Sequence, residues 1–137
     1  HWRADMPSDW NRRENRDGIV YFESADARNG LYIAVWGTPS TEQAVDEVLK
    51  VFVASTMESQ DALAGYKWAR QTVPLEEGEV LLESVAAEPH HRILTRFIAS
   101  SSLVLRASFH DYQFTRLPES NGRLGPSLQA VWLTNLS

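Results

Sequence analysis

The sequence predicts an α+β fold, with an antiparallel sheet of about six strands and two helices packed on it. Six short stretches are rich in β-branched and aromatic side chains, which favour strands. One longer stretch carries apolar side chains at helical spacing, and a second does so near the end of the chain. The connections between the later strands are short, which favours antiparallel neighbours. The expected order is therefore β-β-α-β-β-β-β-α, a layered α+β architecture.

The first two strands are expected at residues 19–24 and 31–36. The link between them, residues 25–30, ends in Asn29-Gly30, which is a turn signal. Every residue from Leu31 to Trp36 is apolar or aromatic, so neither side of this strand is polar. Both faces of the sheet are therefore expected to be at least partly covered at this strand.

A helix is expected from Thr41 to about Glu58. Ser40 and Gln43 fit a capping box, and Glu42 lies where the helix dipole favours an anion. A stripe of apolar residues at helical spacing predicts that this helix packs on the sheet: Val45, Val48, Leu49, Phe52, Val53 and Met57. A further helical turn at residues 60–64 would stop at Gly65.

Four more strands are expected at residues 66–73, 79–87, 91–100 and 103–112, with turn signals between them. Residues 117–126 contain two Pro and two Gly, which predicts a surface loop. A short second helix is expected from Pro126 to the end of the chain. Its apolar stripe consists of Leu128, Val131, Trp132 and Leu136.

Length and composition predict one self-sufficient domain, residues 1–137. The net charge of -5 disfavours nucleic acid and anionic lipid as partners. The absence of cysteine excludes disulfides, thiolate metal sites and thiol nucleophiles. Apolar runs are far shorter than the ~20 residues that a spanning helix needs, and no Gly-rich phosphate loop favours nucleotide chemistry.

The histidines are the first candidates for chemistry. A metal site would need two or three of the four histidines, His1, His90, His91 and His110, to converge with a carboxylate such as Glu88 or Asp111. Adjacent strand residues point to opposite faces, so His90 and His91 cannot both turn inward on a regular strand. Turn and surface histidines are therefore the favoured interpretation, and no metal or cofactor is expected.

Ser108, His110 and Asp111 are residue types that form a nucleophile, a base and an orienting acid. Ser108 and His110 would share one strand face, but about 7 Å apart and without a nucleophile elbow. A small hydrolase centred on them is kept as a third hypothesis, and the end of an ordinary strand is favoured.

The segment from Glu76 to Pro89 holds five acidic and no basic residues, which predicts an acidic edge strand and loop suited to a basic groove in a partner. Glycosidase carboxylates are the weaker interpretation of these acids. Arg12, Arg13 and Arg16 beside Trp10 have an interface composition, although a solvated loop is favoured. The other tryptophans are expected to pack between layers: Trp2, Trp36, Trp68 and Trp132.

The chain has a Pro-x-x-Trp pattern at Pro7-Ser8-Asp9-Trp10, followed by Val20-Tyr21-Phe22 and Leu31-Tyr32-Ile33 in the first hairpin. In these features it resembles the Mog1/PsbP-like and DcrB-like domains. The resemblance extends over nearly the whole chain through the order of helix, meander and last helix. It implies the Mog1/PsbP-like fold and a mostly non-catalytic binding role, as in a nuclear GTPase partner, photosystem extrinsic subunits and bacterial envelope lipoproteins.

The chain is also similar to periplasmic immunity proteins that neutralise peptidoglycan-degrading effectors of the type VI secretion system, particularly muramidases. The expected function is thus that of a toxin inhibitor without enzymatic activity, which occludes the active-site groove of such an effector. The expected location is the periplasm, with a removed export signal or a lipid anchor upstream. The expected partner contacts are Glu76, Glu77, Glu79, Glu88, Glu119, Asn121 and Arg123.

An alternative function is that of an accessory envelope domain of the PsbP or DcrB type that binds a ligand. It predicts a pocket between helix and sheet, lined by Trp36, Phe52 and Trp68. A solid core at that place would contradict it.

Overall fold

The computed structural model describes residues 2–4, 8–14, 19–37, 44–100, 103–121 and 131–133. Its strands before the long helix are β1 (Trp2–Ala4), β2 (Asn11–Glu14), β3 (Val20–Glu23) and β4 (Asn29–Gly37). Helix α1 (Val45–Asp61) follows. After it come β5 (Ala69–Pro74), β6 (Glu79–Ala86), β7 (His91–Ala99), β8 (Leu103–Asp111), a short helix at residues 117–121 and β9 (Val131–Leu133).

Seven strands form one antiparallel sheet in the order β2-β3-β4-β8-β7-β6-β5. The predicted α+β class with an antiparallel sheet is confirmed. The sheet has one strand more than expected, because β2 pairs with the outer side of β3. The predicted meander is confirmed as β5 to β8. Its last strand, β8, pairs with β4 in the centre of the sheet.

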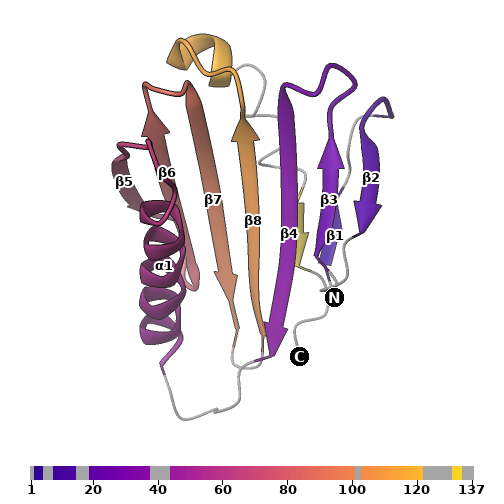
Figure 1. Cartoon of the computed structure of the whole chain (residues 1–137). Coiled ribbons are helices and arrows are strands. Elements are labelled where there is room, and N and C mark those ends of the chain that lie inside the picture. Colours follow the sequence, from indigo (N-terminus) through magenta and orange to yellow (C-terminus); the bar gives the residue numbers. More distant parts are fainter. Residues whose placement is uncertain are drawn as a thin grey trace.

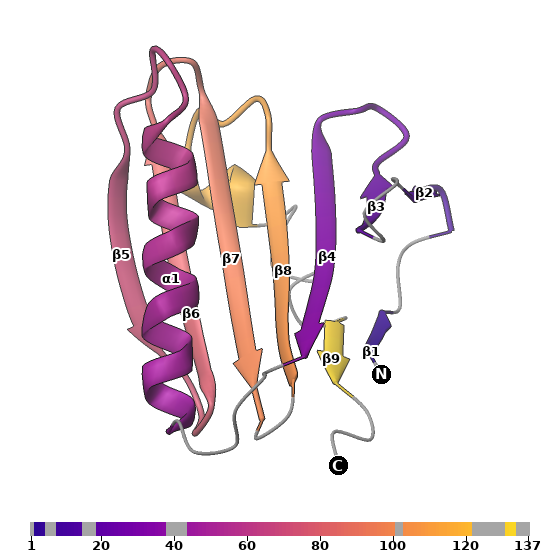
Figure 2. The same cartoon turned by 60° about the horizontal axis from the view of Figure 1, so that its bottom comes forward.

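Helix α1 lies over one half of the sheet only. Figures 1 and 2 show it in front of β5, β6 and β7, with no described element in front of β8, β4 and β3. The two-stranded ribbon of β1 and β9 lies behind the sheet, on the face opposite to α1. The sheet face toward α1 is thus divided into a covered half and an open half.

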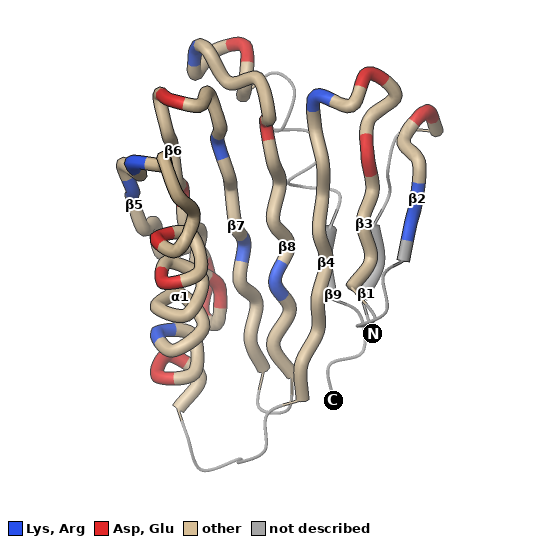
Figure 3. The backbone as a smooth tube through the Cα atoms, viewed as in Figure 1, with Lys and Arg blue, Asp and Glu red and all other residues tan. Residues whose placement is uncertain are grey.

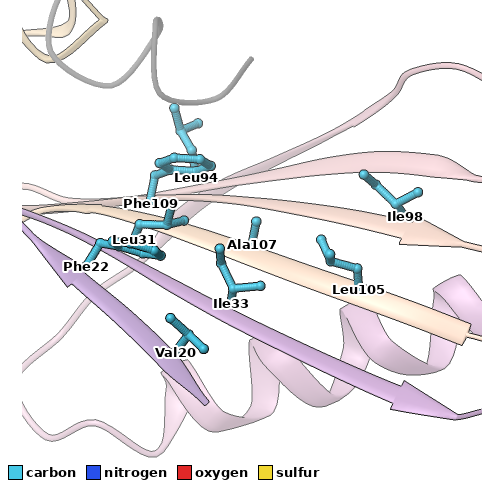
Figure 4. Packing of buried hydrophobic residues seen from close by; sticks show 9 residues of the cluster. All are labelled: Val20, Phe22, Leu31, Ile33, Leu94, Ile98, Leu105, Ala107 and Phe109. Carbon is cyan, nitrogen blue, oxygen red and sulfur yellow. The ribbon is translucent and has the colours of Figure 1, made fainter. Parts of the chain in front are cut away.

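The larger hydrophobic core lies on the face opposite to α1. Alternate residues of β3, β4, β7 and β8 point there, because side chains alternate along a strand. The cluster is drawn in Figure 4 and consists of Val20, Phe22, Leu31, Ile33, Leu94, Ile98, Leu105, Ala107 and Phe109. Trp10 packs against it from the segment before β2.

A smaller core lies beneath α1. Leu49 of the helix packs on Leu82 of β6 and Phe97 of β7, and the helical stripe expected from the sequence adds Phe52, Val53 and Met57. Full burial of such side chains contributes about 1.5–3 kcal/mol each, so this contact holds α1 on β6 and β7. The predicted packing of the helix on the sheet is confirmed.

Three sequence-based boundaries need correction. Helix α1 begins at Val45 after Ala44, which makes no side-chain capping bond, so Ser40 and Gln43 are not its cap and themselves lie outside the described residues. At its other end α1 continues to Asp61, and residues 62–65 form turns rather than a second helical turn. Asn29-Gly30 belongs to β4 and is not the turn.

The end of the chain also differs from expectation. Residues 117–121 are helical where a loop was predicted, and residues 131–133 form a strand where the second helix was predicted. The short strand β9 pairs with β1 at the beginning of the chain. That pairing joins segments nearly the whole chain apart, which local periodicity does not reveal.

Candidate functional site

The open half of the α1-side face carries polar aromatic side chains. Trp36 of β4 contacts Phe52 of α1, with 5.2 Å between the ring centroids, so alternate residues of β4 point to this side. Strand pairing places the neighbours on β3 and β8 on the same side. We call this surface the aromatic face and define it as Tyr21, Tyr32, Trp36, Arg106, His110 and Tyr112, all of which are half-buried.

Tyrosines occupy one end of the aromatic face. The rings of Tyr21 and Tyr32 stack with 4.4 Å between their centroids. The hydroxyl groups of Tyr21 and Tyr112 are hydrogen-bonded at 3.2 Å, and the Tyr21 hydroxyl donates to Glu23 at 3.0 Å. Burial raises the pKa of both Tyr21 and Tyr112, so both phenols stay protonated. They are hydrogen-bonding groups rather than bases.

Gly30 makes room for this arrangement. A Cβ atom at this position would lie 2.6 Å from the Tyr112 hydroxyl oxygen and 2.7 Å from a ring carbon of Tyr21. Such distances are shorter than ordinary Cβ contacts, so the ends of the two tyrosine rings would have to shift to admit a larger residue at this position.

Two histidines meet in the middle of this face. Nε2 of His91 and Nδ1 of His110 are 2.9 Å apart, so one ring donates a hydrogen bond to the other. Burial, followed by the neighbouring His91 and Arg106, lowers the pKa of His110 to about 3. Burial also lowers the pKa of His91, which the charge of Asp111 partly opposes. The pair is therefore neutral at pH 7.

Arg106 lies at the other end of the aromatic face. Its guanidinium carbon is 5.0 Å from the centre of the Trp36 ring, a cation–π distance. Burial lowers its pKa, and the described residues provide no carboxylate that pairs with it. The guanidinium thus contacts an aromatic ring and no acidic side chain in the part of the chain that the structure describes.

A cleft of about 190 Å³ separates α1 from β8 at this point. Arg106 and His110 belong to both the cleft and the aromatic face, so the two form one continuous surface. The lining residues are Thr56, Ser59, Gln60, Leu63, Ile93, Thr95, Arg106, Ser108 and His110. None of these side chains is acidic.

A second, apolar groove of about 500 Å³ lies on the other side of α1, against β5 and β6. Its walls include Leu49, Val53, Met57, Pro74 and Val80. Trp36, Phe52 and Trp68 were expected to line one pocket, but the structure does not bring these three side chains together. Trp36 and Phe52 contact each other, and Trp68 instead donates a hydrogen bond to the carbonyl of Gln60 at 3.0 Å.

The predicted acidic partner site is spread over the molecule. Strand β6 lies between β5 and β7, so the expected acidic edge strand is wrong. Two of its acids have basic partners, since Glu79 accepts from Arg96 at 2.9 Å and Glu83 accepts from Arg92 at 2.6 Å. Figure 3 accordingly shows acidic positions on several separate elements.

The remaining predicted partner contacts lie in the turns at the two ends of β6 and on the short helix at residues 117–121. Glu76 and Glu77 are exposed in the turn before β6, and Glu88 is exposed in the turn after it. The eight residues of β6 separate these turns by about 25 Å. Glu119 and Asn121 are exposed on the helix at residues 117–121, and Arg123 lies outside the described residues.

The structure does not assemble the catalytic triad. Ser108 and His110 line the same cleft, but the Ser108 hydroxyl donates to Thr95 at 3.4 Å and the His110 ring pairs with His91. Asp111 follows His110 on β8 and therefore points to the opposite face, where it accepts from the backbone of Gln113 at 3.1 Å.

Of the residues considered for a metal site, the structure brings two histidines together. His90 is exposed in a turn, while His91 and His110 converge, and within the described ranges no group of three or more His, Asp or Glu residues is placed to hold an ion.

The arginine cluster near Trp10 lies at the edge of the sheet. Arg12 and Arg13 are exposed on β2, with Arg12 5.9 Å from the Phe22 ring, and Arg16 lies outside the described residues.

Sequence reasoning missed Arg106 and the tyrosines. A signal was present, because Arg106, Ser108 and His110 recur with period two in an otherwise apolar strand, which predicts a polar face. That Tyr21 and Tyr32 join this face follows only from the pairing of β3, β4 and β8.

No protein-family model matches this chain, and no curated protein matches it in sequence. Among the described helices, none has the length and apolar character that crossing a bilayer requires. The Mog1/PsbP-like resemblance therefore stays a prediction.

Proposed function

We propose that this protein is a non-catalytic immunity protein that inhibits a secreted peptidoglycan-degrading effector, in particular a muramidase of the type VI secretion system. The observation that carries the proposal is the open aromatic face with Arg106, which has no acidic partner among the described residues. The proposal also draws on the resemblance to periplasmic immunity proteins of this size. In this proposal the protein acts in the periplasm and blocks its partner without chemistry of its own.

The composition of the face favours a protein partner. Tyrosine, tryptophan and arginine are the residues that most often dominate the energy of protein interfaces. Here Tyr32, Trp36 and Arg106 lie on adjacent strands of a rigid sheet, so little conformational entropy is lost on binding. Half-buried aromatic rings with polar tips suit a surface that is wet in the unbound protein and dry in the complex.

The charge of the face favours a muramidase groove. Muramidases work with paired carboxylates that flank the scissile bond, so their grooves are acidic at the centre. The overall charge of this protein is -5, yet its open cleft presents a guanidinium and no acid. A local positive group on an acidic protein fits one specific acidic site better than general attraction to anions.

The test is inhibition of peptidoglycan hydrolysis by secreted muramidases, including any encoded by a neighbouring gene. We expect stoichiometric inhibition by the wild-type protein and at least tenfold weaker inhibition by Tyr32→Ala and Arg106→Gln. Arg116→Gln, at an exposed arginine beside the helix of residues 117–121, is the matched control and should inhibit like wild type. Equal inhibition by all four proteins would refute this face.

The sequence-based contact set gives a separate arm of the same assay. Glu76→Lys combined with Glu77→Lys tests one end of β6, and Glu119→Lys tests the other. If the aromatic face is the binding surface, these charge reversals leave inhibition within a factor of about three. A large loss from either would instead favour the acidic contacts expected from the sequence.

A second candidate function is that of a ligand-binding accessory domain of the bacterial envelope. The apolar groove beside α1 favours it, because Leu49, Val53 and Met57 form a wall large enough for an acyl chain or a small apolar molecule. Saturable binding of a fluorescent fatty acid that Val53→Asp abolishes would support this function. Absence of binding up to the probe's solubility limit would exclude it.

A further inference from the structure

We infer that the cleft between α1 and β8 receives a carboxylate, supplied by an acidic side chain of the protein partner. This inference rests on the proposed function, because it names the chemical group that the partner inserts. The group that receives it is the guanidinium of Arg106, which lines the cleft together with the Thr56 hydroxyl.

Arg106 differs from the other arginines of the meander. Arg70 pairs with Asp61 at 2.7 Å, Arg92 with Glu83 at 2.6 Å and Arg96 with Glu79 at 2.9 Å. Arg106 has a ring of Trp36 as its neighbour and no acidic partner among the described residues. Since a half-buried cation gains most from an acidic partner, a carboxylate is the group that best complements Arg106 in the cleft.

The walls of the cleft complement both ends of an acidic side chain. The guanidinium of Arg106 and the hydroxyl of Thr56 are polar, and Leu63 and Ile93 are apolar. A volume of about 190 Å³ corresponds to roughly six waters, enough for a carboxylate with its methylene groups. The Arg106 fork favours a planar carboxylate, which it can hold with two hydrogen bonds.

The position of the cleft indicates that the carboxylate belongs to a protein. Arg106 and His110 connect the cleft to the aromatic face, so a partner that covers Tyr32 and Trp36 brings its own side chains over Arg106. The absence of acids from the cleft lining means that nothing in the lining repels an incoming carboxylate. A free acid would use the cleft alone and leave the tyrosines untouched.

The first experiment uses the whole protein and a small probe. N-acetyl-glutamate is titrated into isotope-labelled protein, with N-acetyl-glutamine as the neutral control, and the side-chain N–H signals of Arg106 and Trp36 are followed by NMR. We expect saturable shifts in the millimolar range with the acid, none with the amide, and loss of the effect in Arg106→Gln. Equal shifts with both compounds, or none with either, would overturn the inference.

The second experiment is a double-mutant cycle with an inhibited muramidase. The catalytic glutamate of that enzyme is changed to glutamine, and its affinity is measured for wild type and Arg106→Gln. We expect each single change to weaken binding at least tenfold and the double change to add less than threefold further. Independent effects would overturn the inference while leaving the inhibitor function intact.

The two experiments separate the possible failures. If no tested muramidase binds the wild-type protein, the proposed function fails. If the glutamate probe still shifts Arg106 in that case, the cleft does receive a carboxylate and only the muramidase as its source is refuted. Arg106→Lys serves as the conservative variant, and we expect it to retain part of the binding because it keeps the charge but loses the planar fork.

Discussion

Gln60 of α1 accepts a hydrogen bond from the hydroxyl of Ser84 on β6, with 2.7 Å between the two oxygens. Both side chains are buried, and the same Gln60 oxygen also accepts from Nε of Arg70 on β5 at 3.1 Å. The backbone carbonyl of Gln60 accepts a hydrogen bond from the indole N–H of Trp68 at 3.0 Å. One residue thus connects the end of the helix to two strands and to the segment that leads to β5.

Gln60→Leu is expected to destabilise the fold by about 2 kcal/mol, because Ser84 and Arg70 each lose a buried acceptor. Ser84→Ala should cost less, about 1 kcal/mol, since Arg70 then keeps its bond to Gln60. Urea unfolding followed by tryptophan fluorescence measures both values. A Gln60→Leu variant as stable as wild type would show that the helix end is held by packing alone.

Gly30→Ala is expected to destabilise the protein by about 1–3 kcal/mol, because the added methyl overlaps the rings of Tyr112 and Tyr21. Removal of the nearer hydroxyl in the double variant Gly30→Ala/Tyr112→Phe should recover part of that loss. Gly37→Ala is the matched control, since a Cβ there meets no atom within 4 Å. Similar losses at both glycines would contradict the steric explanation.

Glu83→Gln is expected to cost about 2 kcal/mol, because it leaves the buried guanidinium of Arg92 without its carboxylate. Asp61→Asn breaks a pair of similar length, yet Asp61 is 63% exposed, so we expect less than about 0.5 kcal/mol. Thermal unfolding of the two variants at equal ionic strength tests this contrast. Equal costs would mean that burial does not decide the value of these pairs.

Stability is expected to fall as the pH decreases from about 6.5 toward 3. The pKa of His110 is lowered to about 3 and that of His91 is also lowered, whereas unfolded histidine titrates near 6.5. In this window the unfolded chain binds more protons at His110, which favours unfolding by up to ~1.4 kcal/mol per pH unit, and His91 acts in the same direction. The stability that the two neutral histidines contribute is fully present above about pH 6.5.

His110→Gln separates this effect from the titration of carboxylates. The variant removes one of the two buried imidazoles and relieves His91 of a neighbouring ring. Its unfolding free energy should therefore depend less steeply on pH between 6.5 and 4.5 than that of the wild-type protein. Parallel pH profiles would indicate that the pair does not control acid stability.

The sequence was sufficient for the parts of the fold with clear periodicity. The apolar stripe from Val45 to Met57 identified α1, and β-branched runs between turn residues identified β3 to β8. Strand β2 was missed because Asn11–Glu14 is polar and lies at the sheet edge, where only one side of the strand is paired.

The candidate site was harder to predict because it depends on which strands become neighbours. Arg106 and Trp36 are 70 positions apart in the sequence and meet only because β4 pairs with β8. The acidic run seemed unpaired for the same reason, since Arg92 and Arg96, the partners of Glu83 and Glu79, come from the next strand. Local spacing carries no information about such cross-strand pairs.

The most direct test of the central claim is the dissociation constant of the complex with an inhibited muramidase, measured by calorimetry for wild type, Tyr32→Ala, Arg106→Gln and Arg116→Gln. We predict at least tenfold weaker binding for the two variants of the aromatic face and an unchanged dissociation constant for Arg116→Gln, with all four proteins equally folded by circular dichroism. Unchanged affinity in Tyr32→Ala and Arg106→Gln would contradict the central claim.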